Sequence, residues 1–169
     1  MLGLAVVFMY LIMTAQFQSL KSPFIVMFTV PLAFTGGLLG LFVSGKPLSV
    51  IAMIGFVVLS GIIVNNGIVF IDYSNQLIIE KGMEAKEALV IAGKTRLRPI
   101  IMTALTTILG LVTLAAGIGT GADMVQPMAI VTIGGLIYGT ILTLFVVPSV
   151  YLVFHNKGKK KLLSHAKED

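Results

Sequence analysis

The sequence predicts an all-α fold, a polytopic bundle of helices that cross a membrane. Its mean hydropathy is +1.03, and 57% of its residues are hydrophobic while only 11% are charged. Soluble domains carry about 25% charged residues. Uncharged runs of about 20 residues recur, which is the length that a helix needs to cross a hydrocarbon core of about 30 Å. A transmembrane β-barrel would instead show shorter segments of alternating polarity.

Five apolar runs follow one another along the chain, and each predicts one span. They cover residues 1–16, 23–43, 48–73, 99–118 and 127–154. Four prolines stand at or near the start of a run, where a missing N–H costs no helical hydrogen bond. They are Pro23, Pro47, Pro99 and Pro127. Pro31 and Pro148 lie inside runs and predict kinks.

The basic residues assign the two sides of the membrane. They follow the first span, fill the connection between the third and fourth spans, and follow the fifth, whereas only Lys46 lies on the other side. The positive-inside rule then places the C-terminus in the cytoplasm, and an odd number of spans places Met1 outside. The chain is therefore expected to be a multi-pass membrane protein with a cytoplasmic C-terminus.

Two segments outside the spans are expected on the cytoplasmic side. The connection after the third span mixes apolar and charged residues, which predicts an amphipathic surface helix over residues 76–93, ended by Gly93. Residues 155–169 form a basic tail without apolar periodicity, which we expect to be disordered and to contact anionic lipid headgroups. Residues 1–154 constitute the transmembrane domain.

The first residues do not resemble a natural start of a membrane protein. An external N-terminus that begins directly in an apolar run, with no basic flank, suggests that the chain is truncated. A signal peptide is the alternative, but the run lacks a charged n-region and a small-residue cleavage site.

The composition argues against enzymatic chemistry and bound cofactors. There is no cysteine, so a disulfide framework, a thiol nucleophile and a Cys-ligated metal are excluded. The two histidines, His155 and His165, both lie in the tail, so a zinc site is not expected. No phosphate-binding glycine loop, catalytic triad or pair of acid/base carboxylates is present. The net charge of +5 reflects membrane topology and does not indicate nucleic-acid binding.

The most informative polar residues within a span are Asn65 and Asn66, in "GIIVNNGIVFID". On a helix their side chains point about 100° apart, and Asn65 shares its face with Gly61 and Asp72. The two amides can bond neighbouring helices together, or they can line a polar path for ions or protons. The spacing does not separate these two interpretations. Asp72 lies near the span end and is expected in the headgroup region.

The fourth span opens with "RLRPIIMTALTTILG", where Arg96 and Thr103 are seven residues apart and share one helix face. Arg96 and Arg98 can serve as topology anchors, and threonines in such helices usually bond a carbonyl one turn earlier. Two glycine pairs have the spacing that permits close helix packing. They are Gly36 with Gly40 and Gly135 with Gly139.

Two stretches carry a family resemblance: "GIIVNNGIVFIDYSNQL" and the segment from "EALVIAGKTRLRPIIMTALTTILG" to "VVPSVYLVF". Together with "AQFQSLKSPFIVMFTVPLAFTGGLLGL" they resemble the C-terminal membrane half of resistance-nodulation-division (RND) transporters, specifically multidrug efflux pumps of the acriflavine-resistance type. The resemblance covers nearly all of residues 1–154. It implies that the five spans correspond to spans eight to twelve of a twelve-span protomer, in the cytoplasmic (inner) membrane of a bacterial cell.

The resemblance also implies roles for four residues. The family's proton relay combines two aspartates of span four with a Lys of span ten and an Arg and a Thr of span eleven. Arg96 and Thr103 match the last two, and Asn66 matches the Asn that follows the Lys. Asn65 occupies the Lys position, and because an amide cannot supply its charge, either Arg96 carries that role alone or the coupling differs in detail.

The leading functional hypothesis is the C-terminal part of a proton-driven efflux pump for hydrophobic and amphiphilic compounds, inactive by itself. The implied partners are the missing N-terminal half, two further copies in a homotrimer, an adaptor protein and membrane lipids. Two alternatives remain: a stand-alone membrane scaffold or assembly protein, and an RND relative that assists protein or lipid export.

Overall fold

The computed structural model describes residues 1–17 and 21–165, and for 157–165 it describes only the course of the backbone. All regular secondary structure in these ranges is α-helical, which confirms the predicted all-α membrane bundle. Six helices occur in the order α1 (Leu2–Phe17), α2 (Lys21–Met27), α3 (Thr29–Ser44), α4 (Val50–Lys81), α5 (Ala85–Ala115) and α6 (Ala122–His165).

Four helical segments are long and apolar enough to span a membrane: Lys21–Ser44, Val50–Lys81, Ala85–Ala115 and Ala122–Asn156. The segment predicted as the first span forms α1, whose 16 residues fall short of that length. At 1.5 Å per residue, α1 is about 24 Å long, against about 30 Å of hydrocarbon. Helices α2 and α3 together make one span.

The interruption between α2 and α3 has a local cause in Pro31. Its ring has no N–H and clashes with the carbonyl four residues earlier, which is that of Met27, the last residue of α2. Phe28 nevertheless keeps helical torsion angles, with φ −63° and ψ −23°. The predicted kink at Pro31 is therefore a local break within one continuous span. Helix α6 continues through Pro148.

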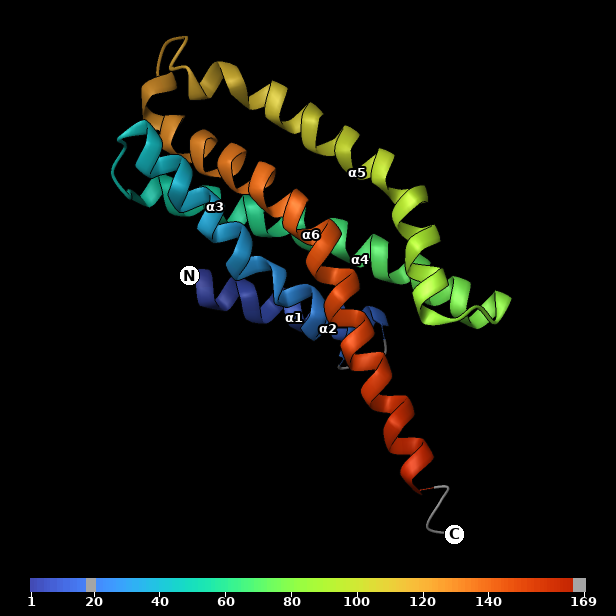
Figure 1. Ribbon diagram of the computed structural model, residues 1–169. Helices are drawn as coiled ribbons and strands as arrows, with labels where there is room; N and C mark the ends of the chain where they lie inside the picture. Colours follow the sequence, from blue (N-terminus) through green and yellow to red (C-terminus); the bar gives the residue numbers. More distant parts are fainter. Residues whose placement is uncertain (18–20, 166–169) are drawn as a thin grey trace.

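The region between α4 and α5 differs from the predicted separate helix over 76–93. Residues 76–81 complete α4, and α5 begins at Ala85 and passes through Gly93 and Pro99. The actual break is at Gly82, which caps the C-terminus of α4 in the left-handed conformation with φ 61°. The backbone is then extended at Glu84, just before α5 begins. Pro99 thus lies inside a helix and not at its start, and Figure 1 shows α5 bending part-way along its length.

The basic tail also differs from the prediction. Helix α6 extends to His165, so most of the predicted disordered tail 155–169 is helical, and residues 166–169 lie outside the described ranges. Residues 157–163 include four lysines and two leucines, which have good helix propensity, and no proline follows Pro148 in the sequence. Its proposed contact with lipid headgroups stays a prediction.

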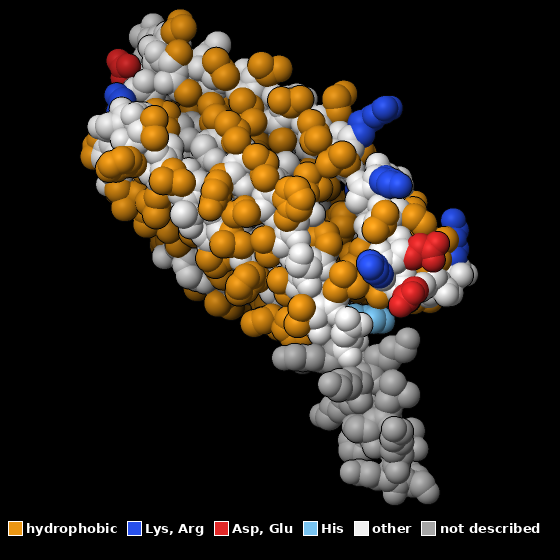
Figure 2. Space-filling view, viewed as in Figure 1, with side chains coloured by type: hydrophobic (Ala, Val, Ile, Leu, Met, Phe, Trp, Pro, Cys, Tyr) orange, Lys and Arg blue, Asp and Glu red, His pale blue; other side chains and the backbone are white. Residues whose placement is uncertain are grey.

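Helix α6 lies at the centre of the bundle and packs against α2, α3, α4 and α5, whereas α1 packs on α2 and α4 (Figure 1). In Figure 2 apolar side chains cover most of the visible face, and charged side chains gather at its two ends. Most of them lie at the end where α4 connects to α5. This distribution suits a bundle surrounded by lipid along its length.

Glycines set the close packing of α3 and α4 on α6. A Cβ on Gly134 would lie 2.8 Å from the carbonyl oxygen of Gly36, and one on Gly40 would lie 3.1 Å from that of Ile130. Gly135 and Gly139 would likewise collide with side chains of α4 and with Ala33 of α3. Both predicted glycine pairs therefore lie at helix contacts, as their spacing indicated.

Candidate functional site

A polar hollow of about 120 Å³ lies between α4 and α5. Its lining residues are Asn65, Asn66 and Val69 on α4, and Arg96, Pro99, Ile100 and Thr103 on α5. All four residues selected from the sequence thus meet around one space. The α5 residues recur at intervals of three and four, so they form one face of that helix.

The two asparagines occupy different environments on α4. Asn65 is exposed, whereas Asn66 is only 6% exposed. The Nδ2 atom of Asn66 is buried and has no hydrogen-bond partner among the described residues. Leaving a buried donor unbonded costs roughly 1–3 kcal/mol. Among the described residues, the Nδ2 group of Asn66 therefore does not bond a neighbouring helix.

Arg96 projects from α5 toward the aromatic ring of Tyr73 on α4. Its Cζ lies 4.8 Å from the ring centroid, a cation–π contact, and its buried Nε lacks a hydrogen-bond partner within the described ranges. Arg96 is half-buried while Arg98 is exposed, so the two arginines differ as their helix positions indicated. Tyr73 was not among the residues predicted from the sequence, although it follows Asn66 by seven residues and therefore shares its helix face.

The threonines of α5 bond their own helix. Thr103 Oγ1 donates to the Pro99 carbonyl at 3.0 Å, Thr106 to Met102 at 2.8 Å, and Thr107 to Thr103 at 2.9 Å. This agrees with the simpler interpretation of these residues. The Thr103 oxygen at the hollow keeps its capacity to accept a further hydrogen bond.

The charge of the hollow is positive, because its lining includes Arg96 and no carboxylate. Asp72 is exposed, accepts a hydrogen bond from Gln76 at 3.3 Å, and lines a separate hollow near the end of α4. A guanidinium stays protonated at physiological pH, and amides do not titrate there. The lining can therefore bind and orient an acceptor or water, but it cannot load and release a proton without a titratable partner.

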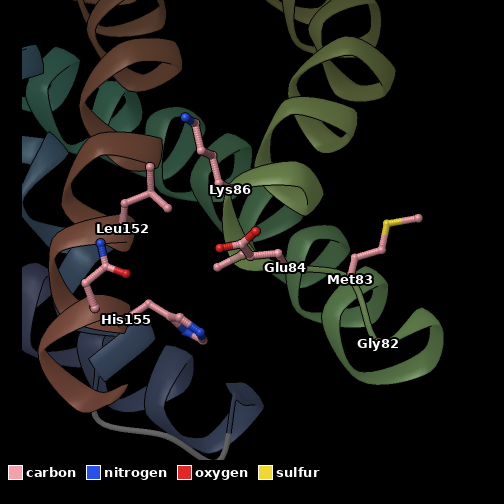
Figure 3. A pocket seen from close by; sticks show the side chains of 8 residues that line it. Gly82, Met83, Glu84, Lys86, Leu152 and His155 are labelled. Atoms are coloured by element: carbon pink, nitrogen blue, oxygen red, sulfur yellow. The ribbon is translucent and has the colours of Figure 1, made fainter. Parts of the chain in front are cut away.

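A larger cleft of about 780 Å³ lies at the end of the bundle, between the α4–α5 connection and α6. Figure 3 shows Glu84 from the connection and His155 from α6 extending into it, while Met83 turns away. No residue of this cleft was predicted to be functional from the sequence. Its lining does not include any of the four candidate residues, so it is separate from the polar hollow.

Comparison with known proteins identifies the family. Residues 1–155 match the AcrB/AcrD/AcrF family. The chain belongs to this family of RND transporters. The swarming motility protein SwrC of Bacillus subtilis is 44% identical over 161 residues, covering 93% of this chain and 15% of SwrC. The cobalt-zinc-cadmium resistance protein CzcA of Cupriavidus metallidurans is 39% identical over 155 residues, covering 92% and 14% respectively.

The fold agrees with the family assignment. The crystal structure of a heavy metal efflux pump has a TM-score of 0.81 to this chain at 35% sequence identity, over 92% of this chain and 15% of that pump. The chain thus spans about one seventh of the length of these RND relatives. They include a metal-resistance protein as well as a motility protein, so the acriflavine-resistance subtype remains a prediction.

Proposed function

We propose that the chain forms part of the membrane domain of a proton-driven efflux transporter, with Asn65, Asn66, Arg96 and Thr103 at its coupling site. The observation that supports this is the convergence of these four side chains on one hollow. Two of them carry buried polar atoms without partners among the described residues, which is the state expected of groups that bond a segment outside this chain.

Coupling at this site depends on the fixed charge of Arg96. A proton antiporter needs a titratable group within the membrane, and the hollow offers none. Carboxylates from other segments of the transporter supply it. When they are ionised, they pair with Arg96 and with the Asn66 amide; when one is protonated, that attraction weakens and the helices can shift. Asn65 contributes hydrogen bonds in place of the family's Lys.

The transported compounds are hydrophobic or amphiphilic molecules. Metal ions are the second candidate, because the similar protein CzcA is named for cobalt, zinc and cadmium resistance. The described part of the chain contains no cluster of three or more metal-ligating side chains. Under either proposal, the groups that select the substrate belong to other parts of the transporter, and this chain contributes to coupling.

The chain acts together with partners. These are an N-terminal half that carries the titratable groups, two further copies in a trimer, and an adaptor protein. The transporter lies in the bacterial cytoplasmic membrane with the C-terminus of the chain in the cytoplasm. Because no carboxylate lines the hollow, the 169-residue chain alone is expected to give no proton-dependent transport.

The test compares two arginine variants in the complete transporter. Arg96→Ala should lower proton-dependent efflux of a fluorescent dye, or of Zn²⁺ for a metal pump, by at least about tenfold, equivalent to ~1.4 kcal/mol. Arg98→Ala is the matched control, because that exposed side chain lies outside the hollow, and its efflux should stay within about twofold of the unmodified protein. Membrane levels of both variants should be equal on immunoblots. Normal efflux by Arg96→Ala would refute the proposed coupling site.

A further inference from the structure

The cleft between the α4–α5 connection and α6 carries charged side chains of both signs. Its wall on the connection side includes Glu84 and Lys86, and its wall on α6 includes His155 and Asn156. Its volume of about 780 Å³ lies within the range of about 300–1,000 Å³ that is typical of sites for small ligands. None of these four residues lines the polar hollow, so the cleft is a second candidate site.

The two charged side chains of the connection are available to a ligand. Glu84 directly precedes α5, and its side chain makes no cap hydrogen bond to that helix. It forms no ion pair with Lys86 or with any other side chain that the structure describes. In Figure 3 the side chains of Glu84 and Lys86 extend in different directions. A carboxylate and an ammonium group that do not neutralise each other can bind a ligand that carries both charges.

His155 contributes an oriented hydrogen-bond donor from the opposite wall. Its ring stacks on that of Tyr151 one turn earlier, with centroids 6.0 Å apart and an angle of 12° between the planes. Tyr151 is itself held in place, because its hydroxyl donates to Asn75 Oδ1 at 2.6 Å. A histidine ring donates from at least one nitrogen in either protonation state. His155 can therefore donate to a ligand that the connection also contacts (Figure 3).

The cleft lies where the surface of the bundle changes from apolar to polar. On α6, the apolar side chains of Val153 and Phe154 are exposed immediately before His155. On α4, Ile79 is 82% exposed three residues before Gly82, which lines the cleft. In a bilayer such apolar side chains contact the acyl chains, and the polar residues that follow them lie at the depth of the headgroups. The cleft is therefore at the depth of lipid headgroups.

We propose that this cleft binds the headgroup of a zwitterionic phospholipid that carries a primary ammonium group. Glu84 accepts hydrogen bonds from the ammonium group, while Lys86 and His155 donate to the phosphate oxygens. A purely anionic headgroup is disfavoured by the Glu84 carboxylate, and a metal ion is disfavoured by the Lys86 ammonium group. Leu152 adds an apolar surface beside these groups. The bound lipid bridges the α4–α5 connection and α6.

The test measures lipid binding to the purified 169-residue chain by native mass spectrometry. The chain in mild detergent receives equal amounts of phosphatidylethanolamine, phosphatidylglycerol and phosphatidylcholine with identical acyl chains. Binding of phosphatidylethanolamine should exceed that of each other lipid at least threefold. Phosphatidylglycerol has no ammonium group, and the trimethylated ammonium group of phosphatidylcholine has no N–H to donate. Equal binding of the three lipids would overturn the proposal.

Two matched pairs of variants locate the binding. Glu84→Gln should reduce the preference for phosphatidylethanolamine over phosphatidylglycerol to near equality. Glu87→Gln removes an exposed carboxylate outside the cleft and should retain the preference. Lys86→Gln should lower the binding of phosphatidylethanolamine at least threefold, whereas Lys81→Gln, at an exposed position outside the cleft, should not. A preference that survives Glu84→Gln would contradict the assignment of the site.

A soluble headgroup distinguishes a lipid from a free phosphate ester. Glycerophosphoethanolamine carries the same ammonium and phosphate groups without acyl chains. At a tenfold excess it should displace less than half of the bound phosphatidylethanolamine, because the lipid also packs its acyl chains on the apolar surface of the bundle. Displacement of more than half would overturn the assignment to a lipid. These measurements do not involve transport, so they would stand if Arg96→Ala left efflux intact.

Discussion

Substituting Gly134 by alanine should destabilise the bundle, although alanine is the better helix former. The added Cβ would lie 2.8 Å from the Gly36 carbonyl oxygen and 3.2 Å from the Gly40 Cα. Both atoms belong to the backbone of α3, so no side chain can rotate away. Because carbon atoms pack at about 3.5–4.0 Å, α3 and α6 would have to separate by several tenths of an ångström.

The expected magnitude combines two opposing effects. Overpacking of a close contact costs typically about 1–3 kcal/mol. Replacing glycine by alanine inside a helix gains up to about 1 kcal/mol. Gly134→Ala should therefore lower the free energy of unfolding by roughly 1–2 kcal/mol. Gly110→Ala is the matched control: a Cβ on Gly110, inside α5, would have no atom within 4 Å, so this variant keeps only the propensity gain.

The assay is thermal unfolding of the purified chain in mild detergent, followed by the loss of the monodisperse peak in size-exclusion chromatography. A difference of about 2 kcal/mol between the two variants corresponds to a gap of about 4–8 °C in melting temperature at this chain length. Gly134→Ala should melt below the unmodified chain, and Gly110→Ala should melt at or above it. If Gly134→Ala were as stable as Gly110→Ala, the close approach of α3 and α6 would be wrong.

Three further predictions concern other contacts. Tyr151→Phe removes the hydrogen bond to Asn75 and should lower stability in the same assay by about 1 kcal/mol; an unchanged melting temperature would argue against that bond. In the complete transporter, Tyr73→Leu should reduce efflux several-fold, whereas Tyr73→Phe, which keeps a ring for the cation–π contact, should retain it. An impermeant thiol reagent should label Ser44→Cys but not Asn156→Cys in intact cells; the reverse pattern would invert the topology.

The fold class was predictable because hydropathy alone decides it. The extents of the helices were not, since proline and glycine were interpreted as helix ends. Pro99 and Gly93 lie within α5, and the break between α4 and α5 occurs at Gly82. A proline inside a helix costs one backbone hydrogen bond and bends the helix. In α5 most buried residues lie before Pro99, at Ala85, Ala88, Leu89 and Ala92, and Ile100 and Ala104 are buried after it. This tertiary packing outweighs the local cost of the proline.

The site was predictable in part. The periodicity of a helix placed Arg96 and Thr103 on one face, but which helix lies opposite depends on tertiary packing. For that reason the contact of Arg96 with Tyr73 was missed, and so were the buried hydroxyls of Thr140 and Thr143, which lack a hydrogen-bond partner among the described residues. The sequence does not distinguish a threonine whose hydroxyl bonds its own helix from one whose hydroxyl does not.

The bundle divides into a tightly packed part and an open part. Helices α3, α4 and α6 meet through glycines, with backbone atoms in near contact, whereas between Pro99 and Ala115 only Ile100 and Ala104 of α5 are buried. The polar hollow lies at the boundary between these parts. Glycine-mediated packing leaves little room for α4 and α6 to move against each other. A change of charge on a group that pairs with Arg96 is therefore expected to move mainly α5. Pro99 follows this arginine by three residues in α5. A hinge at that proline would let the half of α5 after it shift while the half before it stays packed.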